Sequence, residues 1–198
     1  MVVGIREQVE TVLKASGPRR FTVAKYERMH EIGLIAEHER VELVEGRILE
    51  MAAIGFRHAN TVFLANIVLG SLVAPHGVSV QSPIGLSGDS MPQHDLAVVR
   101  REDFSRRRMV ASDVLFVVEV ADSSKRFDLT VKFPRYAAAG IPEGWLFDLT
   151  EDRIQRHSDP GPDGYRQVTS VGRGESLASL VLPSVLIVVD EVLGPPVE

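Results

Sequence analysis

Two acidic residues stand inside or beside apolar segments of the chain. Glu119 lies in the run 114–120, whose remaining six residues are all apolar, and Asp95 directly precedes the apolar segment 96–99. Burying a carboxylate is costly unless a counter-charge accompanies it. If the two segments pair as strands, carboxylates about 4 Å apart repel by roughly 4 kcal/mol at an effective dielectric constant near 20. This pattern predicts either a shared hard cation, Mg²⁺ or Mn²⁺, or separate pairing of each acid with an arginine.

A second set of polar side chains recurs every four residues, at Asp128, Lys132 and Tyr136. This spacing places all three on one face of a helix. One interpretation is an ordinary Asp–Lys helix pair, which contributes about 0.3–0.5 kcal/mol. The other is that Lys132 leans toward the acid pair and supplies a fixed positive charge to an attacking water or to a developing phosphoryl charge.

The composition excludes several classes of protein. The 198 residues carry a net charge of −5 with 44% hydrophobic residues, so the chain is neither polybasic nor disordered by composition. It has no cysteine, which excludes disulfides and thiolate chemistry. No apolar run approaches the roughly 20 residues that span a bilayer, and the acidic and basic residues at positions 6, 7 and 10 do not fit a secretory signal. We therefore expect a cytoplasmic protein without a membrane partner.

One stretch of the chain is dense in arginine. Arg100, Arg101 and the run 106–108 follow the Asp95 segment, interrupted by two acidic residues. A solvated loop is the simpler interpretation. The alternative is a contact with a phosphate backbone, in which Arg106 and Arg107 would bind substrate.

Periodicity and turn residues predict a mixed α/β fold. We expect helices at 5–13, 22–33, 58–73 and 128–140, strands at 78–81, 96–99, 114–120, 145–147 and 185–189, a hairpin at 41–49 turning at Glu45-Gly46, and a second hairpin with a long loop at 158–164. Pro134 lies within the last helix, where a proline removes a hydrogen bond. Length favours a single domain over residues 21–198, preceded by an N-terminal helical extension at 1–20.

The order of these motifs resembles that of a known family. The series is Glu42-Leu-Val-Glu-Gly46, then Asp95-Leu-Ala-Val-Val99, then Val118-Glu-Val-Ala-Asp-Ser-Ser124, then Asp128 with Lys132 and Tyr136. It is similar to the Uma-type putative restriction endonuclease family, a branch of the PD-(D/E)XK nuclease superfamily, over about residues 21–148. The resemblance implies a restriction-endonuclease-like core, in which helices flank a central mixed β-sheet, here with added β-hairpins.

The resemblance also implies roles for single residues. Asp95 and Glu119 match the superfamily's metal-binding aspartate and glutamate, which hold Mg²⁺. The superfamily's lysine usually lies two positions after the glutamate, where this chain has Ala121. The family pattern suggests that Lys132 replaces it from the helix. Glu42 matches an acid of the family's early hairpin, where it either completes the acidic site or lies on a solvated strand face.

Two histidines need separate interpretation. His58 matches a histidine at the start of the family's main helix, and it either takes part in the site or serves as a cap or core contact. His94 stands where the family has proline before the aspartate. It shapes the entry to the strand, contacts substrate, or signals a relaxed site. We favour the first, because adjacent strand residues point to opposite faces.

These observations lead to two functional hypotheses. The first is a Mg²⁺-dependent endonuclease that hydrolyses phosphodiester bonds of nucleic acid, with DNA the favoured substrate and Tyr136 and His58 as further substrate contacts. The second is a non-catalytic binding or assembly module that keeps the nuclease-like fold, which the acidic net charge and the missing proline favour. The added hairpins and the apolar C-terminal strand offer surface for a homodimer in either case.

Overall fold

A six-stranded mixed sheet forms the centre of the molecule in the computed structural model, which describes residues 17–196. The strands, in spatial order, are β3 (Gly77–Val80), β4 (Leu96–Val99), β5 (Val114–Ala121), β6 (Glu143–Asp148), β7 (Arg153–Gly161) and β8 (Gly164–Gly172). Neighbouring strands are antiparallel except β5 and β6, which run parallel. The mixed α/β class predicted from the sequence is confirmed.

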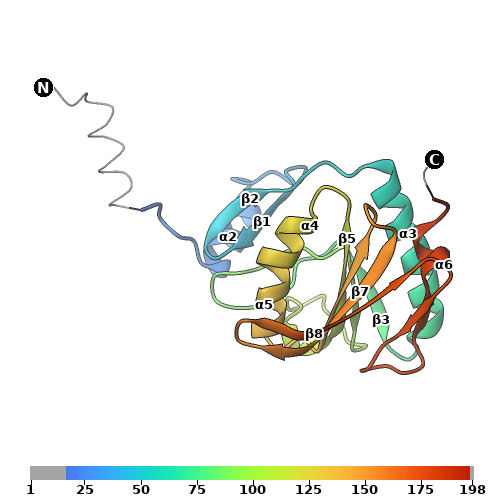
Figure 1. The fold of residues 1–198 in the computed structure, drawn as a ribbon. Helices are drawn as coiled ribbons and strands as arrows, with labels where there is room; N and C mark the ends of the chain where they lie inside the picture. The colour runs from blue at the N-terminus through green and yellow to red at the C-terminus, as the bar shows by residue number, and fades with distance from the viewer. Residues whose placement is uncertain (1–16, 197–198) are drawn as a thin grey trace, which may run out of the picture.

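Helices cover both faces of the sheet (Figure 1). On one face, α3 (Phe56–Leu72) and α6 (Val189–Leu193) pack on the first hydrophobic cluster, which includes Phe116 and Trp145. On the other face, α5 (Phe133–Ala138) packs on a second cluster around Val117. Because both faces are covered, all eight residues of β5 are buried, as its continuous apolar run requires.

The remaining elements are short. The α2 helix (Val23–Glu31) and the hairpin of β1 (Val41–Val44) and β2 (Arg47–Glu50) share a third cluster, centred on Leu43. Near the C-terminus, β9 (Ser176–Ala178) pairs with β10 (Leu186–Val188). In the middle of the chain, the 3₁₀ turn η1 (Ala111–Asp113) leads into β5. Among the helices of residues 17–196, none combines the length and the apolar character that crossing a membrane requires.

The helix that connects the parallel strands β5 and β6 contains an irregular turn. It begins as α4 (Lys125–Phe127), widens into the π-helical turn η2 (Asp128–Lys132) and continues as α5. Pro134 is the second residue of α5, and a proline has no N–H to continue the regular helical ladder. The crossover that a parallel strand pair needs therefore carries a π turn, a feature often found at functional sites.

Most expected elements are present with small changes of boundary. Thr22 caps α2 by accepting from the N–H of Lys25 at 3.3 Å, and Gly33 follows with φ of 71°. The prediction of a long loop at 158–164 is wrong. The strands β7 and β8 extend into this segment and leave only residues 162–163 between them. The helix α6 and strand β9 were not predicted. The expected helix at 5–13 lies outside the described residues, and the division at residue 20 stays a prediction.

Candidate active site

A pocket of about 420 Å³ opens where the β1–β2 hairpin, the start of α3, the strands β4 and β5, and the turn η2 meet. Its polar floor is formed by Glu42, His58, Asp95, Glu119, Asp128 and Lys132. Its volume lies within the range of small-molecule sites in proteins. Four carboxylates, one ammonium and one imidazole thus come from five separate elements into one pocket.

Lys132 lies at the centre of the acidic groups. Its ammonium donates to Glu119 Oε2 at 3.1 Å, and it lies 3.8 Å from Glu42 Oε2 and 3.9 Å from Asp128 Oδ1. It also donates to the backbone carbonyl of Gln93 at 2.7 Å. Glu119 and Lys132 are 1% and 5% exposed, so these contacts are made out of water. The position of Lys132 at the end of η2, four residues after Asp128, places its ammonium between that acid and the sheet.

Glu119 receives a second donor from the same helix. The buried hydroxyl of Tyr136 donates to Glu119 Oε1 at 2.6 Å, so each oxygen of the carboxylate accepts one hydrogen bond from the crossover helix. Tyr136 does not line the pocket. Tyr136 therefore acts on the site only through its hydrogen bond to Glu119, which fixes the orientation of that carboxylate.

Asp95 lies beside Glu119 because β4 and β5 are antiparallel neighbours, with Leu96 opposite Val118. Its Oδ2 accepts from the backbone N–H of Val120 at 2.8 Å and from His58 Nε2 at 3.1 Å. A carboxylate can only accept, so the His58 tautomer in this pair carries its proton on Nε2. His58 thus holds Asp95 from the α3 side of the pocket, and its contact with substrate stays a prediction.

Glu42 is held by the backbone of the segment that precedes Asp95. The N–H of Gln93 donates to Glu42 Oε2 at 3.1 Å, while the Gln93 carbonyl accepts from Lys132. Glu42 is 4% exposed, so the alternative of a solvated strand face is wrong. The hairpin is held against the rest of the site by the N–H of Met91, which donates to the Leu43 carbonyl at 2.8 Å.

Burial and charge act together on the pKa values of these groups. Burial would lower the pKa of Lys132, but the carboxylates around it, with Glu119 first, hold that pKa above its ordinary value. Burial raises the pKa of Glu119 well above its ordinary value, against the opposing charge of Lys132. Burial likewise raises the pKa of Asp128 to about 6. Since six carboxylates line the pocket with only two cationic side chains, Lys132 and Arg40, the pocket carries a surplus of negative charge that favours uptake of a proton or a cation.

Asp95 differs from the other acids. Burial would raise its pKa, but the hydrogen bond and charge of His58, together with the Val120 N–H and Lys132, hold the pKa below its ordinary value. Asp95 is therefore the carboxylate of the pocket most strongly held in its ionised form.

The oxygen donors of this pocket fit a hard divalent cation. Mg²⁺ is commonly bound through one or two carboxylates, with water and substrate phosphate completing its shell. Within residues 17–196, no three Asp, Glu or His side chains are grouped closely enough to hold a metal ion by themselves. Asp95 and Glu119 are two such carboxylates, and Asp95 Oδ1 accepts no hydrogen bond from the described residues.

The other predicted residues lie elsewhere. Arg107 pairs with Asp113 and Glu102, and together with Arg106 it lines a separate hollow beside η1. The structure does not bring these two arginines to the acidic pocket. His94 is 1% exposed and hydrogen-bonds with Ser79 Oγ at 3.2 Å on β3. It does not line the pocket, which agrees with a role in shaping the entry to β4.

Several pocket residues were not singled out from the sequence as site residues. Arg40, Phe127 and the linker 51–55 form its rim, and Asp128 completes its acidic floor. The linker Met-Ala-Ala-Ile-Gly is apolar without the period of a helix or a strand, a signal that could have marked it as a wall. The backbone of Gln93 has no comparable signal, because any residue type supplies the same N–H and carbonyl.

Comparison with known proteins shows the fold and the family of the chain. A crystal structure of a putative nuclease belonging to DUF820 from Anabaena variabilis ATCC 29413 matches the fold with a TM-score of 0.62 and 15% identity, covering 77% of this chain and 89% of that one. No curated protein matches the chain. The model of the Uma2 family, described as a putative restriction endonuclease, matches residues 23–190. The chain belongs to the Uma2 putative restriction endonuclease family.

Proposed function

We propose that this protein is a Mg²⁺-dependent endonuclease that hydrolyses phosphodiester bonds of DNA. The observation that carries the proposal is the position of Lys132 between Glu42, Glu119 and Asp128, next to Asp95, in one pocket. Membership of a restriction endonuclease family supports the same reaction class.

Asp95 and Glu119 are the residues that would hold the cation. When bound, Mg²⁺ supplies stabilisation of phosphoryl charge and makes water more acidic. Lys132 adds a fixed positive charge where negative charge develops, which costs no reorganisation during the reaction. Tyr136 and His58 orient Glu119 and Asp95, respectively, so that both acids keep one arrangement. Glu42 holds Lys132 from the hairpin side.

The proposal is tested by metal binding and by cleavage. We expect isothermal calorimetry to detect Mn²⁺ binding to the wild-type protein, and Asp95→Asn to abolish it. Asp163→Asn, in the exposed β7–β8 turn, is the matched control and should bind as the wild type does. We expect the wild type and Asp163→Asn to cleave DNA with Mg²⁺ or Mn²⁺, and Asp95→Asn to lose cleavage. Wild-type protein that binds neither cation and cuts no DNA would contradict the proposal.

A non-catalytic binding module is the second candidate. The specific observation that favours it is that both oxygens of Glu119 already accept hydrogen bonds, from Lys132 and Tyr136. In that case the ammonium of Lys132 takes the place of a metal ion. The calorimetry above separates the two functions, because this module would show no Mn²⁺ binding while keeping its fold.

A further inference from the structure

The acidic pocket has an apolar wall that the proposed hydrolysis does not require. Phe127 on α4, and Met51 and Ile54 in the linker before α3, line the pocket together with its charged groups. None of the three belongs to a hydrophobic cluster of the described residues, and Ile54 is 39% exposed. Folding therefore does not explain why these large apolar side chains gather here.

The position of Phe127 follows from the turn next to it. Phe127 directly precedes Asp128, so one short segment delivers an aromatic ring and a carboxylate to the same pocket. It is only partly buried, which leaves part of the ring free to meet a ligand. Other aromatic residues, such as Phe133 and Tyr165, are instead paired with one another and do not line the pocket.

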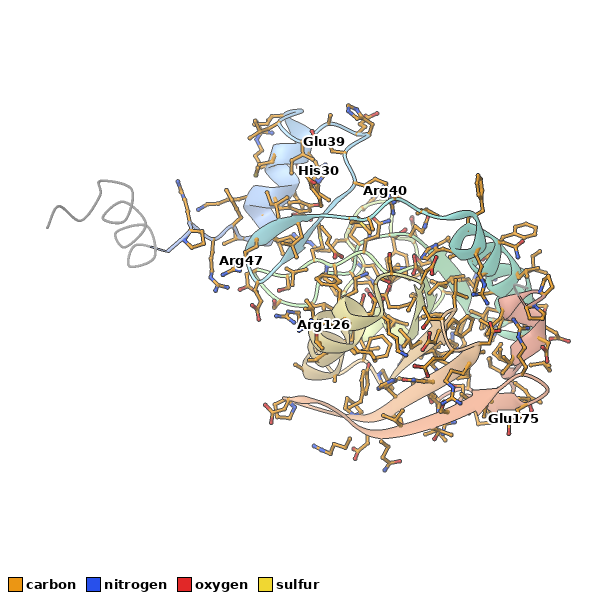
Figure 2. The ribbon with its side chains drawn as sticks, turned by 45° about the horizontal axis from the view of Figure 1, so that its top comes forward. His30, Glu39, Arg40, Arg47, Arg126 and Glu175 are labelled. Atoms are coloured by element: carbon orange, nitrogen blue, oxygen red, sulfur yellow. The ribbon has the colours of Figure 1, made fainter. Side chains whose placement is uncertain are left out.

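Positive charge at the pocket is sparse. Apart from Lys132, the pocket is lined by one Lys or Arg side chain, Arg40, which donates to the Ala52 carbonyl at 2.8 Å. Within residues 17–196, Arg40 forms no salt bridge with a carboxylate and donates to a neutral carbonyl, so its charge remains available to a phosphate. Figure 2 shows Arg40 and Arg47 at opposite ends of the β1–β2 hairpin, with Arg126 on the crossover helix. Proteins that bind duplex DNA neutralise several phosphates with lysine and arginine side chains.

From this geometry we infer that the pocket takes one unpaired nucleotide of a DNA strand, with its base against Phe127 and its phosphate near Arg40. The face of a base is accessible only when the base is unstacked, as in single strands and flipped nucleotides. An apolar wall with one aromatic ring and few cations near it suits stacking of a base better than capture of a duplex backbone. The inference rests on the proposed nuclease function and narrows its substrate to single-stranded DNA or unpaired positions.

Binding can be measured without cleavage. Fluorescence anisotropy of a short labelled single strand, in EDTA, gives its affinity, and the same sequence as a duplex is the comparison. We expect Phe127→Leu, which stays apolar but cannot stack, to weaken single-strand binding about fivefold to 150-fold, the range found for loss of an aromatic stacking partner. Duplex binding should be unchanged. Phe63→Leu, at an exposed aromatic of α3 away from the pocket, is the matched control and should leave both affinities unchanged.

A second variant reports the stacking directly. Phe127→Trp keeps an aromatic ring, so we expect near wild-type affinity and quenching of its emission as single strand is added. The natural Trp145 is fully buried and stacked on Phe116, so it provides a constant background. Phe63→Trp should show no quenching.

The charge at the rim is tested by a matched pair. Arg40→Gln should reduce the dependence of log affinity on log salt by about one, while Arg47→Gln at the far end of the hairpin should not change it.

Three outcomes would overturn the inference. They are unchanged single-strand affinity in Phe127→Leu, an equal loss for single strand and duplex, and absence of DNA binding by the wild type. Cleavage assays with Mg²⁺ keep the two proposals separate. A protein that binds single strands through Phe127 but never cuts DNA retains this inference and loses the hydrolysis. If Phe127→Leu cuts DNA as well as the wild type does, the proposed hydrolysis is retained and this inference is lost.

Discussion

The ammonium of Lys132 lies 3.1 Å from the Glu119 carboxylate although the two residues belong to different layers of the fold, the crossover helix and the central strand. Both are almost completely buried, and the pair is the point at which helix, sheet and hairpin acids meet. The packing of these three parts of the fold and the proposed chemistry therefore involve the same contact.

Loss of the Lys132 charge should destabilise the fold. Lys132→Met keeps a long side chain but leaves the carboxylates around it without their counter-charge, which typically costs about 3–5 kcal/mol for a buried pair. Urea denaturation at neutral pH measures the loss, and adding Glu119→Gln should recover part of it. Lys25→Met, at an exposed position of α2, is the control and should change the unfolding free energy by less than about 0.5 kcal/mol. Equal effects of the two single substitutions would contradict this account.

Removal of the Tyr136 hydroxyl should cost more than removal of an equivalent hydroxyl elsewhere. Tyr136 donates to a buried carboxylate, whereas Tyr165 donates to the neutral Ile141 carbonyl at 3.0 Å. Hydrogen bonds to charged groups contribute about 1.5–3 kcal/mol and neutral ones about 0.5–1.5 kcal/mol. Denaturant titration of Tyr136→Phe and Tyr165→Phe should show this order. A larger loss in Tyr165→Phe would mean that the carboxylate of Glu119 does not depend on its tyrosine donor.

The turn of the β1–β2 hairpin should be sensitive to a single methyl group. Gly46 has φ of 70°, and a Cβ there would lie 2.7 Å from Arg20 Cβ and 3.0 Å from the Phe21 carbonyl. Gly33 has nearly the same φ, 71°, but a Cβ there would meet nothing within 4 Å. Gly33→Ala should therefore cost only the left-handed backbone penalty of about 1–2 kcal/mol.

Gly46→Ala should cost more, because it adds a clash at the hairpin that carries Glu42. Thermal denaturation of both variants separates the clash from the backbone penalty. Similar losses in the two would show that the segment at Arg20 moves aside freely.

Acid should weaken the fold through His157. Burial lowers the pKa of His157 to about 4, and its ring lies edge-on to Phe133 at 4.8 Å. The unfolded chain, with an ordinary pKa near 6.5, takes up the proton first as pH falls. This contribution to stability is complete above about pH 6.5 and is lost toward pH 4, with a slope of up to about 1.4 kcal/mol per pH unit.

Unfolding free energies measured across that range should fall less steeply in His157→Gln. The control His38→Gln, at an exposed loop position, should keep the wild-type slope. An unchanged slope in His157→Gln would assign the acid sensitivity to other groups.

Much of this site could be predicted from residue types alone. Asp95 and Glu119 stood out because a carboxylate beside an apolar strand needs a partner, and β4 and β5 do pair as neighbours. The helical spacing of Asp128, Lys132 and Tyr136 also placed their side chains correctly, in spite of Pro134. The distance between Lys132 and Glu42 could not be predicted, because it depends on how the hairpin packs against residues about ninety positions later in the chain.

The errors have physical causes as well. Asp159, Pro160 and Gly161 indicate a turn, but β7 continues through them because Asp159 takes a positive φ of 59° while the strands on either side stay paired. The place of Arg106 and Arg107 beside η1 was not evident from their density in the sequence. Arg107 pairs there with Asp113 and Glu102, a three-dimensional contact that local sequence does not reveal, and the contact of both arginines with phosphate stays a prediction.

Ala121 stands two positions after Glu119 in β5, where the resemblance noted from the sequence leads one to expect lysine, and it is fully buried against the α5 side of the sheet. A motif search that requires a lysine two positions after the acid on the same strand would miss this chain. Here the ammonium of Lys132 reaches Glu119 from the crossover helix instead. Relatives with the same substitution are better compared by overlaying the spatial positions of their charged atoms than by alignment columns. With Lys132 on the crossover helix, every residue of β5 except Glu119 is apolar.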